Sequence, residues 1–133
     1  MNRIYITIIF SCWAFIAYSQ HDSDRIVGRW INVPKENVII EVYKSGQEYK
    51  GRIVWSKDND KKKPVGFIIL EKLAYDTKTR TWQKGVVHDP SNENTYNASA
   101  QINSDSTLEL HAYAGLRFLG TKKSFKRAAV SIK

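Results

Sequence analysis

A chain of 133 residues is long enough to bury one hydrophobic core and too short for two domains. Its one cysteine, Cys12, rules out an internal disulfide. The formal net charge of +8 favours anionic partners such as envelope lipid or polysaccharide, although a solvated basic surface without a dedicated partner fits the same composition.

The first nineteen residues have the pattern of a secretory signal peptide. Arg3 supplies a positive charge, residues 4–16 are almost unbroken apolar sequence, and Ala17 and Ser19 are small residues at the cleavage positions. The apolar run is shorter than the roughly 20 residues of a transmembrane helix. We therefore expect a signal peptide over 1–19 and a mature chain over 20–133, periplasmic or secreted and without a transmembrane segment. An uncleaved anchor and lipidation at Cys12 are the alternatives.

Removal of this leader would change the chemistry that the chain can carry. The mature protein keeps 20 basic and 13 acidic residues, a net charge of +7, and no thiol. Cysteine nucleophiles and cysteine metal ligands are then excluded, and export argues against a nucleic-acid partner.

Turn residues divide the mature chain into short apolar or alternating stretches. Gly46 ends one such stretch, residues 56–64 form a charged loop, and Asp89-Pro90 forces a turn because proline fixes its φ and lacks an amide donor. Residues 65–75 are apolar on both faces, and we interpret them as a strand. The expected strands are 26–31, 38–43, 49–55, 65–75, 82–88, 95–102, 108–113 and 118–126. This spacing predicts an all-β fold, either an antiparallel sandwich or an up-and-down barrel.

Four stretches, residues 26–30, 49–55, 82–96 and 110–127, resemble the signature blocks of a family of small exported bacterial proteins. That family is catalogued as a domain of unknown function and is regarded as lipocalin-like or calycin-like. The resemblance implies a single up-and-down antiparallel β-barrel of about eight strands, and it lends no known activity. The signature positions are Gly28, Trp30, Gly51, Gly85, Asp89, Pro90, Gly115, Gly120 and Arg127.

The resemblance also implies an arrangement at the closed end of the barrel. In lipocalin-like barrels a Gly-x-Trp on the first strand packs there, and a basic residue from the last strand lies over the indole. Gly28 and Trp30 match the first feature, and Arg127 or Lys126 matches the second. We therefore expect Gly28 and Trp30 to be architectural.

A barrel of this size is either filled by its own side chains or holds one small ligand. Alternation places Tyr49, Ile53, Trp55 and Tyr96 on inward faces, where they would line a cavity. With Trp82 and His88 they are our candidate ligand-binding residues, and the ligand would be a small apolar or amphipathic molecule.

Two clusters of polar residues suggest other functions. His88, Asp89 and Glu93 fall within one turn, as a metal or general acid/base cluster would require, but the same residues can simply shape the turn. Asp58-Asn59-Asp60 has calcium-like spacing, yet it lacks the glycine and the distal glutamate of a calcium loop. Surface lysines could form a patch for anionic envelope lipid or polysaccharide: Lys57, Lys61, Lys62, Lys63, Lys122, Lys123 and Lys126.

Together these patterns predict an exported monomeric barrel that binds a small apolar or amphipathic molecule, or an envelope component, without catalysis. No cofactor or metal is expected. One alternative is a protein with a filled core that acts through its basic surface on anionic lipid, polysaccharide or a protein partner. The other is an enzyme built on His88, Asp89 and Glu93.

Overall fold

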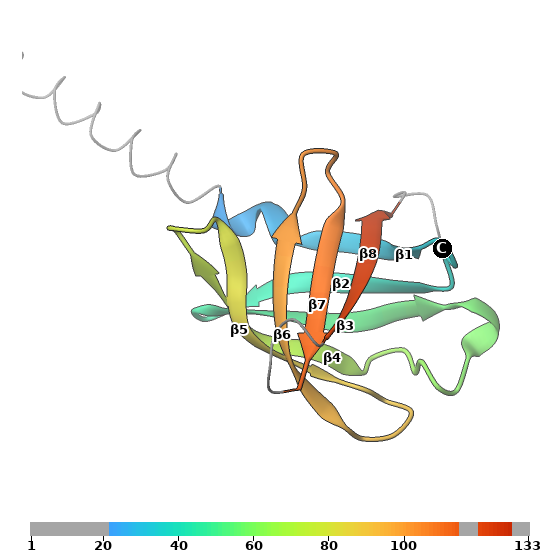
Figure 1. The fold of residues 1–133 in the computed structure, drawn as a ribbon. Helices are drawn as coiled ribbons and strands as arrows, with labels where there is room; N and C mark the ends of the chain where they lie inside the picture. The colour runs from blue at the N-terminus through green and yellow to red at the C-terminus, as the bar shows by residue number, and fades with distance from the viewer. Residues whose placement is uncertain (1–21, 115–119, 129–133) are drawn as a thin grey trace, which may run out of the picture.

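The structure is a computed structural model that describes residues 22–114 and 120–128; the expected signal peptide, Gly115 and Phe118 lie outside these ranges. The described chain forms a closed antiparallel barrel whose strands neighbour one another in sequence order (Figure 1), which confirms the predicted fold class. The strands are β1 (Gly28–Val33), β2 (Val38–Ser45), β3 (Glu48–Ser56), β4 (Ile68–Asp76), β5 (Thr81–His88), β6 (Thr95–Ile102), β7 (Leu108–Tyr113) and β8 (Thr121–Arg127). Two 3₁₀ turns, η1 (Ser23–Ile26) and η2 (Lys57–Asn59), precede β1 and follow β3.

The strands lie close to where turn residues and alternation predict them. The ambiguous stretch 65–75 is indeed extended, but β4 begins only at Ile68 because a turn occupies Val65 and Gly66. The described part of the last strand ends at Arg127. Within the described residues, no helix has the length and hydropathy needed to span a membrane.

A bulge in β3 changes the direction of one candidate side chain. Ile40 of β2 lies opposite Ile53, whereas Ile39 lies opposite Trp55, so β3 has one extra residue at Val54. A one-residue insertion moves the following side chains to the other face of a sheet. The expectation that Trp55 points into the barrel is therefore wrong: it shares the outer face with Ile39.

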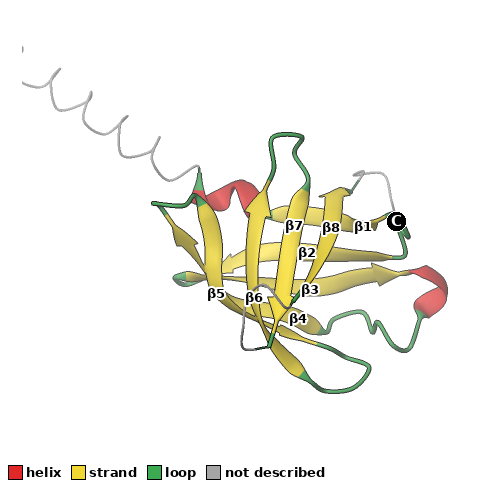
Figure 2. Cartoon of the chain, viewed as in Figure 1, coloured by secondary structure: helices red, strands yellow, loops and turns green. Residues whose placement is uncertain are grey.

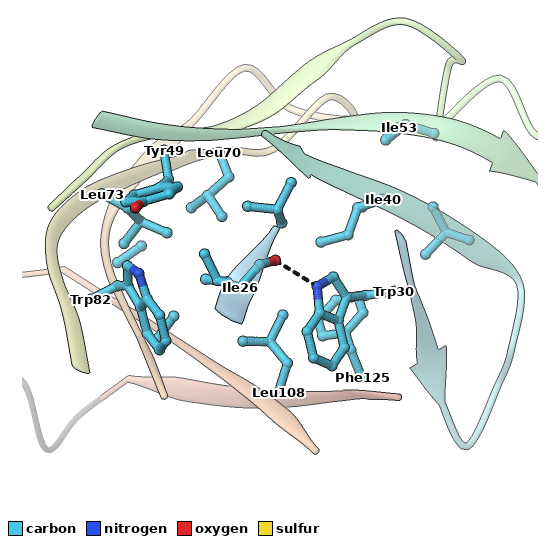
Figure 3. Close-up of a cluster of buried hydrophobic side chains, with 14 residues drawn as sticks. Ile26, Trp30, Ile40, Tyr49, Ile53, Leu70, Leu73, Trp82, Leu108 and Phe125 are labelled. Carbon is cyan, nitrogen blue, oxygen red and sulfur yellow. Dashed lines mark hydrogen bonds between the residues drawn. The ribbon is translucent and has the colours of Figure 1, made fainter. Parts of the chain in front are cut away.

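The interior of the barrel is occupied by a cluster of 14 buried side chains (Figure 3). Tyr49, Ile53 and Trp82, three of the candidate ligand-binding residues, belong to this cluster and are 2%, 0% and 0% exposed. Burial of one large apolar side chain stabilises a fold by about 1.5–3 kcal/mol. The cluster is therefore the main source of stability, and these three residues contribute to it.

The turn η1 closes one end of the barrel. This is the end that carries the β2–β3, β4–β5 and β6–β7 hairpins, and Ile26 inserts there with no exposed surface. Aromatic side chains of the barrel hold the turn by hydrogen bonds. Trp30 Nε1 donates to Ile26 O (2.9 Å, dashed in Figure 3), Trp82 Nε1 to Ser23 O (3.1 Å) and Tyr49 Oη to Asp24 Oδ1 (2.7 Å).

The expected closed-end arrangement of Gly28, Trp30 and Arg127 is present. The Arg127 guanidinium lies 3.9 Å from the centroid of the Trp30 ring. Gly28 has φ +134°, which side chains rarely adopt, and a Cβ there would lie 2.6 Å from Arg127 Nη1. Lys126, the other candidate, pairs with Glu36 instead (3.2 Å).

The remaining signature glycines allow close packing between strands. A Cβ on Gly85 would lie 2.6 Å from Leu73 Cδ2, and one on Gly51 would lie 3.3 Å from Leu70 Cβ. A Cβ on Gly120 would collide with the carbonyl oxygen of Ala112. All three positions are therefore structural.

Candidate functional site

The end of the barrel opposite η1 carries the best candidate site. Two long connections meet there, residues 57–67 between β3 and β4 and residues 89–94 between β5 and β6 (Figure 1). Figure 2 shows η1 and η2 in red at opposite ends of the barrel. We call the η2 end the open end.

A pocket of about 610 Å³ lies between these two connections. One wall comes from the apolar end of the 57–67 loop and the start of β4, and the other from the end of β5 and the β5–β6 turn. Ile68 is 41% exposed and Phe67 is half-buried against the core, so apolar surface faces this hollow. The lining residues are Gly66, Phe67, Ile68, His88, Asp89, Pro90 and Glu93.

His88 is held by a carboxylate on the neighbouring strand. Its Nε2 donates to Glu71 Oε2 at 2.5 Å. The two side chains are 28% and 29% exposed. The hydrogen bond from His88 lowers the pKa of Glu71 below its ordinary value of 4.5. Glu71 is therefore ionised at neutral pH and orients the imidazole at the edge of the pocket.

Asp89 shapes the turn. Its Oδ1 accepts hydrogen bonds from the backbone nitrogen and the hydroxyl of Ser91 (2.9 and 2.6 Å), and its backbone pairs with Asn94 across the turn (2.9 Å). The hydrogen bonds from Ser91 lower the pKa of Asp89, and nearby Lys123 adds a smaller effect. The Asp89 carboxylate therefore stabilises the β5–β6 turn.

The three predicted cluster residues do not converge. Among the described hydrogen bonds, His88 bonds to Glu71 and not to Asp89 or Glu93. Within the described ranges no group of three or more His, Cys, Asp or Glu residues could hold a metal ion. In the Asp58-Asn59-Asp60 segment, Asp60 accepts from the backbone of Lys62 and pairs with Lys63 (3.3 Å), which leaves its oxygens directed at the loop.

The candidate ligand-binding residues fall into three groups. Tyr49, Ile53 and Trp82 are packed in the core, and Trp55 lies on the outer face. Tyr96 lies on the inward face of β6 near the open end, opposite Val87 and half-buried. Of the six, His88 alone lines the pocket.

A second hollow, of about 570 Å³, lies on the outer face of β5 to β8. Most of its lining residues are polar, and Gly120 at its border follows residues 115–119 in the sequence, which lie outside the described ranges. The residues are Thr81, Gln83, Ser99, Ala100, Gln101, Glu109, His111, Gly120 and Lys122.

Carboxylates pair with several lysines of the predicted basic patch. Lys63 lies 3.3 Å from Asp60, Lys122 lies 4.0 Å from Glu109, and Lys126 lies 3.2 Å from Glu36. Lys57, Lys61 and Lys62 are exposed in the 57–67 loop. The patch is therefore reduced to this loop and Lys123.

Sequence reasoning missed Glu71, Phe67 and Ile68 as parts of the site. A usable signal existed for Glu71. Counting outward from the β4–β5 turn places Glu71 opposite Val86 and diagonal to His88, which puts both polar side chains on one face. No local signal marks Phe67 or Ile68, because their exposure depends on where the distant β5–β6 turn lies.

The closed barrel of strands β1 to β8, with η1 packed across one end, is a lipocalin-like fold. The fold is similar to the solved structure of protein HP1028 from Helicobacter pylori, described as belonging to the lipocalin family, with a TM-score of 0.65. The two chains are 17% identical, and the match covers 79% of this chain and 84% of that one, so the similarity shows the fold alone. Residues 28–127 match the family described as an uncharacterised protein conserved in bacteria, DUF2147, and the chain belongs to that family. None of the curated proteins matches this chain.

Proposed function

We propose that this protein is an exported lipocalin-like binding protein that holds a small apolar or amphipathic ligand at the open end of the barrel and catalyses no reaction. The observation that carries the proposal is the pocket of about 610 Å³ between the 57–67 loop and the β5–β6 turn. Pockets of about 300–1,000 Å³ are typical of small-molecule sites.

The lining of the pocket supports an amphipathic ligand. Phe67, Ile68 and Pro90 offer apolar surface, whereas His88 and Glu93 offer polar groups at the rim. The interior cluster argues against a deeper site, because Tyr49 and Trp82 use their polar atoms to hold η1. The proposed ligand therefore sits at the mouth of the barrel.

Export is the second part of the proposal, and the composition of residues 1–19 supports it. A carrier outside the cytoplasm, in the periplasm or secreted, would meet envelope lipids and other amphipathic molecules. The side chains of His88, Asp89 and Glu93 make no hydrogen bond to one another among the described contacts, which favours binding over the alternative of an enzyme built on these three residues.

Native mass spectrometry of the protein purified gently from its own host tests the proposal. We expect an adduct of lipid size that disappears on denaturation and returns when the bare protein is incubated with an envelope lipid extract. Ile68→Asp should weaken this adduct at least tenfold, because it places a charge on the apolar wall.

Val27→Asp is the matched control, because Val27 is an exposed valine (39%) at the closed end. This variant should retain the adduct. A bare polypeptide mass before and after incubation with the extract, or equal loss in both variants, would reject the pocket and favour the alternative of a partner bound through the basic surface.

A further inference from the structure

Apolar side chains and lysines gather on the loop that forms one wall of the pocket. In the described parts of the chain, three large apolar side chains are exposed: Val65 (59%), Ile68 (41%) and Val27 (39%). Two of them, Val65 in the Val65-Gly66 turn and Ile68 at the start of β4, lie at the open end. Val65 does not line the pocket, so its exposure is not explained by the proposed ligand.

The same loop carries a positive charge. Residues 57–67 contain four lysines and two aspartates, a net charge of +2. Asp60 pairs with Lys63, and the exposed Lys61 and Lys62 lie just before Lys63, Pro64 and Val65 in the same loop. The neighbouring β5–β6 turn adds Asp89 and Glu93, and Lys123 lies near enough to Asp89 to lower the pKa of its carboxyl. Lys61 and Lys62 are exposed within four residues of the exposed Val65, so positive charge and apolar surface lie on the same loop.

We propose that the 57–67 loop docks the open end of the barrel onto an anionic phospholipid membrane, with Val65 inserted at the level of the headgroups and Lys61 and Lys62 on the lipid phosphates. Basic side chains next to an exposed apolar tip are the combination that binds the interface of an anionic bilayer. A second copy of the chain fits less well. Two half-exposed side chains offer only a small fraction of the roughly 1,200 Å² that a stable protein interface buries, and two positive loops would repel each other.

The docking loop is continuous with one wall of the pocket. Residues 66–68 follow Val65 directly and form part of the pocket wall, so a docked barrel would present the pocket to the membrane surface. The docking itself does not depend on the proposed ligand, because neither Val65 nor the lysines line the pocket.

Co-sedimentation of the purified protein with vesicles tests the docking. The vesicles are made of phosphatidylcholine alone or of phosphatidylcholine mixed with phosphatidylglycerol, at low and at physiological salt. We expect binding to the mixed vesicles that weakens with salt, and little binding to the neutral ones. The double variant Lys61→Glu/Lys62→Glu should lower the partition coefficient by about 25-fold or more at low salt, since each lysine contributes about fivefold.

Val65→Asp should lower binding at both salt concentrations, because it removes the inserted group. The matched control is Val27→Asp/Lys78→Glu, which makes the same kinds of change on exposed residues at the closed end. Thermal melting curves check that each variant is folded. The proposal is overturned if the native protein binds no mixed vesicles, if it binds neutral vesicles equally, or if the closed-end control loses as much binding.

The two proposals fail separately. Val65→Asp and Lys61→Glu/Lys62→Glu should keep the lipid adduct in native mass spectrometry while they lose the vesicles. Vesicle binding without any adduct would reject the ligand pocket and leave the docking in place. An adduct without vesicle binding would reject the docking and leave the ligand pocket in place.

Discussion

Arg127 joins the last strand to the segment that plugs the closed end. Its guanidinium covers the Trp30 ring and donates to the backbone oxygens of Val27 (2.9 Å) and Arg25 (2.5 Å). Burial lowers the pKa of Arg127, yet the group remains charged at neutral pH. One side chain therefore satisfies two carbonyls of the η1 segment and packs on the indole.

Replacement of Arg127 by alanine should lower the free energy of unfolding by about 2 kcal/mol, the combined size of a cation–π contact and two partly exposed hydrogen bonds. Arg127→Lys should recover less than half of the loss, because an ammonium cannot cover the ring and reach both carbonyls. Urea denaturation measures the effect. Lys126→Ala is the control and should cost under about 0.5 kcal/mol, as its ion pair with Glu36 is exposed. Equal losses at positions 126 and 127 would contradict this account of the closed end.

At the scale of elements, the β5–β6 hairpin positions one wall of the pocket. Pro90 ends β5, and the Asp89 carboxylate holds the turn through Ser91. Because folding lowers the pKa of Asp89 below its ordinary value of 3.8, the turn is stabilised by the ionised form. This contribution is complete above the unfolded pKa and is lost as the pH falls through the folded one.

Asp89→Ala should destabilise the protein by about 1 kcal/mol at pH 7, through the loss of two turn hydrogen bonds. The difference from the native protein should shrink as the pH falls from the ordinary pKa of 3.8 through the lower pKa of the folded carboxyl. Urea denaturation at a series of pH values measures both. Glu93→Ala removes the same charge from the same turn and should change stability little at any pH. A difference for Asp89→Ala that stays constant into the acid range would argue against ionisation as the source.

At the scale of the whole molecule, export would give the expected leader and the barrel separate roles. The family match begins at residue 28 and the described fold at residue 22, so both lie after the expected cleavage site. The chain's only cysteine, Cys12, lies within the expected leader. Processing would therefore change the redox chemistry of the protein as well as its location.

We expect the protein recovered from the envelope or the medium to have an intact mass that corresponds to a start near Gln20. A thiol-reactive label should mark the precursor and not the mature form. Ala17→Lys should block processing, because the cleavage site needs small residues, and Ser23→Ala, which lies after the site, should not. A full-length mass outside the cytoplasm, or a lipid-modified mass that starts at Cys12, would establish one of the alternative leader types.

Local chemistry in the sequence predicts the strands well, and the site only in part. Turns such as Asp89-Pro90 and Gly46 depend on nearby atoms, so the approximate strand positions and the all-β class follow from them. The choice of a barrel over a sandwich depends on pairing between distant strands, and it came from the family resemblance. Strict alternation places the Trp55 side chain on the wrong face of the sheet. Its direction depends on the bulge in β3, which arises in the pairing with β2. The pocket depends on two connections far apart in the sequence, so only His88 among its lining residues was a predicted ligand contact.

The pairing of β1 with β8 has a consequence for the time course of synthesis. β1 finds its first neighbour, β2, within a few residues, but its second neighbour is the last strand of the chain. A growing polypeptide therefore carries an incomplete sheet with bare edges until Arg127 has emerged, and such edges recruit other chains. Chaperones that shield nascent chains would have to cover β1 for nearly the whole of translation. A chain truncated within β8 could not close the barrel, so its β1 edge would stay exposed.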